Sequence, residues 1–381
     1  MRLRPALCSL WLAATALGQL NTDALFRETL AQANLSPQEA RFDPRLFDYF
    51  FRTQYATPLF EMLLRDPLRL PYYAERLRNS LVGAVGRPVA AVESGASAIG
   101  VSVRRTLVGD PLQAARERAN APNALENAVV ALYEAAKTPI PPAVRQQLTR
   151  AQRDAPETVQ REAAFLIYAA IDARRWRDAA LRDLTPDEQR ALFQLLSLPI
   201  KAFEGALGGA EPSGELLLLE RALEKADLPR LLAGGHDCAL AVQQSIEAFQ
   251  KADAPTKEAS GKPFDAAIDT PWGQVRLCGG ANDTHPRQPY LLLIDTGGDD
   301  TYYGGGANAS LENAVSLLID LAGNDRYADD AETLGKPLVE REGRGGRAGV
   351  AFGGAALGYA VLADLAGDEV YRTQAAGLGA A

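Results

Sequence analysis

A short segment that occurs three times near the C-terminal end constrains the fold of this 381-residue chain more than any other sequence feature. Each copy is an apolar run followed by an Asp, two residues, a Gly, two residues drawn from Asp, Asn and Glu, one residue and a Tyr. The copies are LLIDTGGDDTY at 292–302, LLIDLAGNDRY at 317–327 and VLADLAGDEVY at 361–371. Each copy predicts a β-strand followed by a tight turn, because glycine adopts the positive φ angles that such turns need.

A degenerate copy precedes these three. It occupies 275–285, with Cys278 at the first Asp position and His285 at the Tyr position. The first Asp residues of consecutive copies are 25 and 44 residues apart, and the longer spacing contains a polar insertion at 328–347. A unit of this size is too small to bury its own strand, whereas stacked units bury their strands jointly. The repeats therefore predict a parallel β-solenoid over 264–381.

Stacked copies bring their acidic residues into columns, because neighbouring strands lie about 4.8 Å apart. This places nine candidate metal ligands in three columns. They are Asp295, Asp320 and Asp364 at the first position, Asp299, Asn324 and Asp368 at the second, and Asp300, Asp325 and Glu369 at the third. Carboxylates at this distance repel each other by about 1 kcal/mol per pair in water, and calcium, which binds several carboxylate oxygens, relieves that repulsion. The alternatives are raised pKa values and backbone N–H donors, with each first-position Asp only capping its own turn.

The Gly/Asp-rich copies resemble the coils of secreted bacterial β-solenoid proteins and, more remotely, the calcium-binding turns of RTX proteins. The resemblance covers about 270–381 and implies ions held between successive turns. The pattern departs from RTX turns in its spacing of 25 residues and in the placement of its glycines. Calcium is the one cofactor that we expect. We expect Tyr302, Tyr327 and Tyr371, which end the three copies, to stack as a structural ladder rather than to form a sugar platform.

The first two thirds of the chain carry helical patterns. Ser36 and Thr185 each begin a capping box, with Pro at the next position and Glu three residues later. Apolar residues at intervals of three and four predict helices over about 123–137, 157–178 and 186–207. These patterns predict an all-α structure for this part of the chain.

The predicted fold class is α+β with two domains. An all-α domain at 19–251 is followed by a linker at 252–263, which is polar and contains Pro and Gly, and then by the β-solenoid at 264–381. The small residues at the C-terminal end contain no further copy, so the chain ends inside a coil. This predicts either a solenoid truncated at its C-terminus or an open end that associates end to end with a second subunit.

Residues 1–18 have the features of a secretory signal peptide. Arg2 and Arg4 precede a short apolar core, and small residues follow it. The apolar core is shorter than the roughly 20 residues of a membrane-spanning helix. We therefore expect the mature chain to be secreted, periplasmic or at the cell surface, with no transmembrane segment.

Two cysteines, Cys238 and Cys278, and the two histidines of the chain, His236 and His285, follow this segment. Export makes a disulfide between the cysteines feasible, and two buried free thiols are the alternative. A zinc site that uses all four residues is a third interpretation, although their spacing matches no zinc motif.

Catalytic motifs in this sequence are incomplete. Ser97 follows Gly95 as in a nucleophile elbow, but Ile99 stands where the second Gly of that motif belongs. His236, Asp237 and Cys238 are consecutive, and adjacent side chains do not converge on one atom. The two glycines before them, at 234–235, predict a helix break. We therefore assign no catalytic residue.

The charge distribution excludes one class of partner. The net charge is −8, and residues 261–381 hold 17 acidic against 9 basic residues, whereas nucleic-acid binding needs a basic face. The sequence therefore favours an exported, non-enzymatic binding or structural protein with an adhesion or scaffold role, whose partners are calcium and a surface glycan or protein. The alternatives are a carbohydrate-active enzyme with its groove on the solenoid, and a binding or catalytic pocket in the helical domain.

Overall fold

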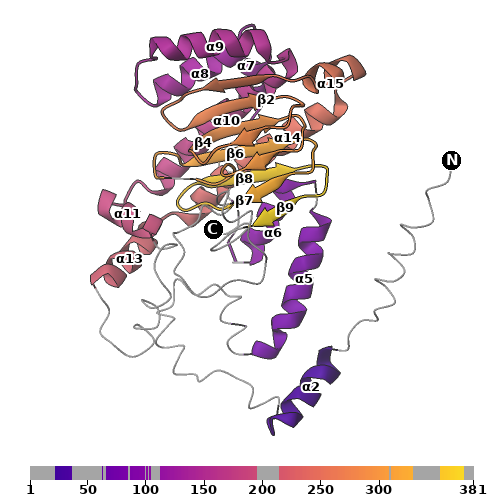
Figure 1. Ribbon diagram of the computed structural model, residues 1–381. Coiled ribbons are helices and arrows are strands. Elements are labelled where there is room, and N and C mark those ends of the chain that lie inside the picture. The colour runs from indigo at the N-terminus through magenta and orange to yellow at the C-terminus, as the bar shows by residue number, and fades with distance from the viewer. Residues whose placement is uncertain are drawn as a thin grey trace, which may run out of the picture. The chain divides into compact units, whose positions relative to one another are not determined.

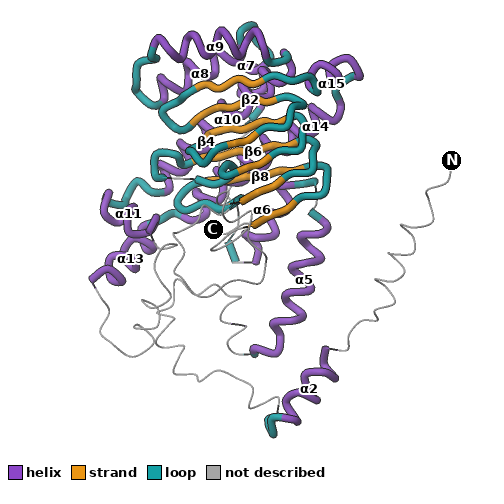
Figure 2. Tube along the Cα trace, viewed as in Figure 1, coloured by secondary structure: helices purple, strands orange, loops and turns teal. Residues whose placement is uncertain are grey.

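The structure is a computed structural model that describes part of the 381-residue chain (Figure 2). The described residues are 22–36, 62, 66–84, 86–98, 100–101, 103, 112–194, 214–308, 310–328 and 352–372. The chain forms two compact units. The smaller unit is Met1–Gly83 with Ser97–Gly100, and the larger is Ala84–Ala96 with Val101–Ala381.

Helices dominate the chain before residue 261. The smaller unit contains α2 (Thr22–Gln32), the 3-10 helix η1 (Pro67–Arg69) and α5 (Leu70–Gly83). The other described helices are α6 (Pro88–Ala98), α7 (Gln113–Ala119), α8 (Ala124–Ala135), α9 (Pro142–Asp154), α10 (Glu157–Ala180), α11 (Pro186–Gln194), α13 (Gly214–Lys225), α14 (Leu228–Lys251) and α15 (Ala254–Ser260). The two longest, α10 and α14, pack against each other (Figure 1).

The described strands form two sheets. The larger sheet has the order β1-β2-β4-β6-β8, and the smaller has the order β3-β5-β7-β9. Strands of the larger sheet are β1 (Asp265–Ile268), β2 (Gln274–Cys278), β4 (Tyr290–Asp295), β6 (Val315–Asp320) and β8 (Tyr359–Asp364). Strands of the smaller sheet are β3 (Thr284–His285), β5 (Thr301–Tyr302), β7 (Arg326–Ala328) and β9 (Val370–Arg372). All neighbouring strands are parallel except β1 and β2, which are antiparallel.

The register of both sheets follows the alignment of the repeats. In the larger sheet Cys278 pairs with Asp295, Asp295 with Asp320, and Asp320 with Asp364. In the smaller sheet the aromatic positions pair in the same way, beginning with His285 beside Tyr302. Equivalent positions of consecutive copies therefore lie side by side, as the sequence predicts.

The larger sheet is buried on both faces. One face packs against α10 and α14, where Leu292 and Ile294 share a hydrophobic core with Phe165 (Figure 1). On the other face Leu293 and Leu318 form a second core with side chains that include the tyrosines of the smaller sheet. Every residue of β4 and β6 is buried as a result.

The predicted fold class, an all-α domain followed by a separate parallel β-solenoid, is wrong. The strands form two short sheets, one of them mixed, and the larger sheet shares its core with the helices of the preceding 150 residues or so. The physical reason lies in the apolar runs. A strand with one face in solvent alternates apolar and polar residues, whereas continuous runs such as Leu291–Ile294 belong to strands that are covered on both faces.

The helix predictions are confirmed where the structure describes the residues. The expected helices at 123–137 and 157–178 correspond to α8 and α10, and α11 covers the first part of 186–207. The capping box at Thr185 is formed. The Glu188 amide donates to Thr185 Oγ1 at 3.3 Å, and the Thr185 amide donates to the Glu188 carboxylate at 2.7 Å.

Several predictions concern segments outside the described residues. These are the signal peptide at 1–18, the segment after Ser36, the end of the helix expected to reach 207, nearly all of the insertion at 328–347 and the C-terminal tail. The segment at 252–263, predicted to be a linker, contains α15, whose Asp253 side chain accepts a hydrogen bond from the Thr256 amide at 3.0 Å.

The predicted helix break at Gly234 and Gly235 is also wrong, because both glycines lie inside α14. The ring of Tyr359 on β8 occupies the space that a side chain at Gly234 would fill, whereas a Cβ at Gly235 would only touch it, at 3.4 Å. Gly234 is therefore needed for close packing of a helix on a sheet, a requirement that a helix pattern alone does not reveal.

Replacing Gly234 with alanine is expected to destabilise the protein by about 1–3 kcal/mol, as overpacking of a core does. The added Cβ would overlap the Tyr359 hydroxyl and lie 2.9 Å from its Cε2. Gly95→Ala on α6 is the control, because nothing lies within 4 Å of its added Cβ. Thermal unfolding of both variants measures the difference, and equal melting temperatures would contradict the packing argument.

Candidate metal centre

The first-position aspartates end the parallel strands of the larger sheet and cap the turns that follow. Asp295 and Asp320 are fully buried. One oxygen of Asp295 accepts from the Gly297 amide at 3.1 Å, and one oxygen of Asp320 accepts from the Ala322 amide at 3.1 Å. The turn-capping interpretation therefore accounts for one oxygen, Oδ1, of each of these two carboxylates.

The second oxygen of each first-position Asp contacts the aromatic residue of the preceding copy. His285 Nε2 lies 3.1 Å from Asp295 Oδ2, and the Tyr302 hydroxyl donates to Asp320 Oδ2 at 2.5 Å. The Tyr327 hydroxyl donates in the same way to Asp364 at 3.0 Å. The aromatic rings also stack on one another, with ring centroids 4.5–4.7 Å apart from His285 through Tyr302 and Tyr327 to Tyr371. The aromatic ladder that the sequence predicts therefore holds the first-position aspartates of the larger sheet in place.

The third-position residues carry unused oxygens. Asp300 and Asp325 are 1% and 0% exposed. Each Oδ1 accepts a backbone amide of the preceding copy, that of Asp283 at 2.5 Å and that of Asp300 at 2.7 Å. When these carboxyl groups are ionised, their Oδ2 atoms have no hydrogen-bond partner among the described residues, nor do Asp283 Oδ2 and Glu369 Oε1. Each of the four copies therefore contributes one buried carboxylate oxygen without a partner, an arrangement that is costly unless something binds there.

The second-position residues lie on the surface and form hydrogen bonds from one copy to the next. Asp299, Asn324 and Asp368 are exposed. The Asn324 amide donates to Asp299 Oδ1 at 2.9 Å, and the Asp368 amide donates to Asn324 Oδ1 at 3.1 Å. These contacts form a ladder on the surface that continues to Asn282 of the degenerate copy. In the described part of the chain, neither Asp299 nor Asp368 belongs to a cluster of His, Cys, Asp and Glu side chains that could hold a metal ion.

The other six predicted ligands do converge, in clusters whose ligand atoms all lie within 4.8 Å of one another. The three carboxylate clusters are Asp283 with Asp295 and Asp300, Asp300 with Asp320 and Asp325, and Asp325 with Asp364 and Glu369. Consecutive clusters share Asp300 and Asp325. Asp283 is not among the ligands predicted from the sequence, although its place at the third position of the degenerate copy is the signal that identifies it.

Burial raises the pKa values of several carboxyl groups in these three clusters. Loss of hydration raises the pKa of Asp295, Asp300 and Asp320 well above the ordinary range of aspartate, and neighbouring carboxylates raise it further. Burial also raises the pKa of Asp325 and Asp364. A bound cation or retained protons are the two ways in which so many buried carboxyl groups can lie together.

The cysteines and histidines separate into two places. Cys238 and Cys278 are both buried and free, so the free-thiol alternative describes this structure. His236 lies beside Glu93, with His236 Nε2 3.3 Å from Glu93 Oε1. His285 lies instead with Cys278 and Asp295 at the start of the carboxylate row. The four residues therefore do not form one zinc site.

Comparison with protein-family models, with curated proteins and with solved structures gives no match. A function for this chain therefore has to come from the chemistry of its own residues. In the part of the chain that the structure describes, no helix has both the length and the apolar character needed to cross a membrane.

Proposed function

We propose that this chain is an exported calcium-binding protein with a structural role in adhesion or scaffolding. The observation that carries the proposal is the row of four buried carboxylate oxygens, one per copy, that lack hydrogen-bond partners. Calcium ions in the three carboxylate clusters would bind these oxygens and so link each turn to the next. The expected signal peptide supports the exported location.

The donor set favours calcium among common cations. All three clusters offer carboxylate oxygens, the ligands of hard cations. Calcium binds oxygen at 2.3–2.6 Å, so two ligands on opposite sides of one ion are about 4.6–5.2 Å apart. The ligand atoms of each cluster lie within 4.8 Å of one another, so one calcium ion could reach all of them. Calcium also tolerates an irregular arrangement of oxygens, whereas magnesium requires a regular octahedron.

Burial favours a structural role over a catalytic one. A glycosidase needs two carboxyl groups that flank a bound sugar. Asp295, Asp300 and Asp320 are at most 1% exposed, so a sugar chain cannot reach them as they lie. The exposed second-position ladder remains available for a glycan or protein partner.

Calcium is expected to raise the melting temperature of the chelator-treated protein, because it binds the folded state alone. At 100 times the dissociation constant the gain is about 2.7 kcal/mol, and it rises with free calcium. Asp325→Asn should abolish most of this gain, since Asp325 belongs to two clusters. Without calcium the variant should be at least as stable as the wild type, because it carries one fewer buried carboxylate.

Asp299→Asn is the matched control for that experiment. Asparagine keeps the Oδ1 acceptor of the surface ladder and already stands at the equivalent positions 282 and 324. This variant should respond to calcium as the wild type does. The proposal would be overturned if neither chelator nor calcium changed the melting temperature of the wild type. It would also be overturned if the two variants lost the same share of the stabilisation by calcium.

A further inference from the structure

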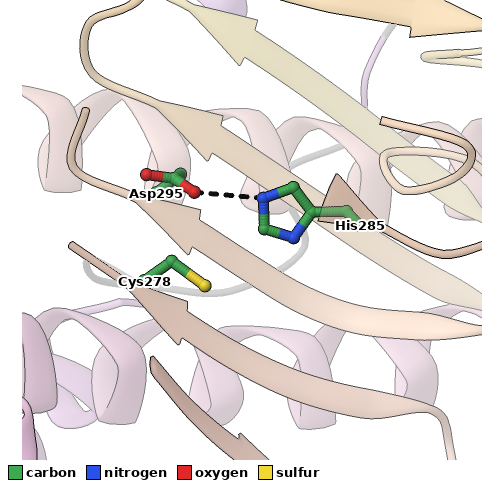
Figure 3. Close-up of side chains that lie close together, drawn as sticks. All are labelled: Cys278, His285 and Asp295. Carbon is green, nitrogen blue, oxygen red and sulfur yellow. Dashed lines mark hydrogen bonds and ion pairs between the residues drawn. The ribbon is translucent and has the colours of Figure 1, made fainter. Parts of the chain in front are cut away.

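A fourth cluster, at the start of the carboxylate row, has a different chemistry. Cys278 ends β2, Asp295 ends β4 beside it, and His285 reaches toward both from the smaller sheet (Figure 3). One ligand atom from each of the three side chains lies within 4.8 Å of the others. All three residues are 0% exposed. This cluster replaces the Asp and Tyr of the other copies with Cys and His.

The imidazole of His285 is held in place with one nitrogen facing Asp295. Its ring stacks on Tyr302 at a centroid distance of 4.5 Å, and its Nε2 lies 3.1 Å from Asp295 Oδ2. The other nitrogen, Nδ1, is buried without a hydrogen-bond partner among the described residues. Burial lowers the pKa of His285 to about 4, so the ring is neutral at physiological pH, which is the form that binds metals.

We propose that Cys278, His285 and Asp295 form a binding site for a transition-metal ion of the zinc class. Thiolate, imidazole and carboxylate are the ligands that such ions prefer, whereas the neighbouring clusters offer oxygen alone. Two ligands on one tetrahedral zinc lie about 3.4 Å apart for bonds to nitrogen and oxygen. His285 Nε2 and Asp295 Oδ2 are 3.1 Å apart, so an ion that replaces the contact between them would bind His285 through Nε2. A water molecule would complete the four-coordinate shell.

Binding would require Cys278 to give up its proton to solvent. The thiol donates to Asp265 Oδ1 at 3.7 Å, and the other oxygen of Asp265 pairs with Arg276 at 2.9 Å. Burial raises the pKa of the Cys278 thiol, so the thiolate forms only when a cation stabilises it. Metal binding at this site should therefore strengthen as the pH rises.

The same residue types occur in cysteine nucleophiles, but the surroundings favour a metal. A nucleophile has to reach its substrate. The Cys278 side chain is fully buried, and an ion needs far less room to enter than a substrate does. The proposal does not depend on calcium in the carboxylate clusters, although Asp295 belongs to both sites.

Cobalt titration of the metal-free, full-length chain tests the proposal. The expected result is one equivalent of cobalt with a thiolate-to-metal charge-transfer band and the visible bands of tetrahedral cobalt, both removed by zinc. His285→Tyr and Cys278→Ser should each abolish the bands and weaken zinc binding by at least about tenfold. His285→Tyr should still fold, because tyrosine occupies the equivalent position in the other three copies.

Two controls separate this site from its neighbours. Cys238→Ser removes the other buried thiol and should leave the cobalt bands unchanged. Asp325→Asn disrupts two carboxylate clusters without touching this one and should also leave the bands unchanged, so failure of calcium binding and failure of zinc binding are distinguishable. The proposal is overturned by a wild-type chain without the charge-transfer band, by bands that persist in Cys278→Ser, or by rapid alkylation of Cys278 in the native protein that His285→Tyr slows.

Discussion

Replacing Gly323 with alanine is expected to lower the melting temperature by roughly 5–10 °C, which corresponds to a loss of about 3 kcal/mol. The added Cβ would overlap the carbonyl oxygen of Gly298 in the preceding copy and lie 2.7 Å from an oxygen of Asp325. This carbonyl lies in the turn between β4 and β5, packed directly against the turn of the next copy, so it has little room to move aside. The φ angle of Gly323 is not positive, so the loss would measure close approach of the chain rather than backbone strain.

The same close approach recurs along the repeat. An added Cβ at Gly298 would overlap the carbonyl oxygen of Ala281, and one at Gly367 would overlap that of Gly323. Gly304→Ala is the control, because its nearest neighbour would be Arg287 Cα at 3.5 Å. Chemical denaturation followed by circular dichroism compares the two variants. A Gly323 variant as stable as the Gly304 variant would mean that successive turns do not lie this close together.

The second large effect concerns pH. Between pH 6.5 and 8, the metal-free protein is expected to lose stability as the pH rises. Burial raises the pKa of Asp295 and of Asp300 to about 7 and that of Asp320 to about 9, whereas an unfolded aspartate has a pKa of about 3.9. The folded state thus retains protons that the unfolded state has lost, and the free energy of unfolding falls by up to about 1.4 kcal/mol per pH unit for each retained proton.

This pH range isolates the carboxyl groups from other titrating side chains. The pKa of His285 is lowered to about 4, so below pH 6.5 this residue acts in the opposite direction, and the raised pKa of the Cys278 thiol matters only at higher pH. Urea unfolding at each pH, in chelator, measures the slope. Saturating calcium should flatten or reverse it, because calcium takes the place of the retained protons. Stability that rises with pH in chelator would show that these aspartates are ionised in the folded protein.

The repeat alignment alone predicts much of the local structure. Because paired strands keep equivalent residues side by side, the alignment predicted that Asp295, Asp320 and Asp364 lie in one row. It also predicted the stacking of Tyr302 on Tyr327. These features follow from the spacing of the repeats, because backbone hydrogen bonds between parallel strands keep equivalent residues side by side.

The division between second- and third-position carboxylates could not be predicted in this way. Asp299 and Asp300 are adjacent in the sequence, yet Asp299 joins the surface ladder and Asp300 is buried in a cluster. The direction of each side chain depends on the backbone of the turn and on the carbonyl of the preceding copy, which lies against Gly298. The sequence of two neighbouring acidic residues does not indicate which of the two side chains is buried.

The sequence by itself determined the strand repeats, their register, the turn caps and the helices α8 and α10, because each depends on residues close in the chain or on a regular spacing. Only the tertiary structure decided that α10 and α14 cover the larger sheet, and that Cys278, His285 and Asp295 converge. The reason is that cover by helices depends on contacts between distant segments, and convergence depends on the direction that each side chain takes from its strand. The apolar run at Leu291–Ile294 requires cover on both faces without specifying whether another coil or a helix provides it.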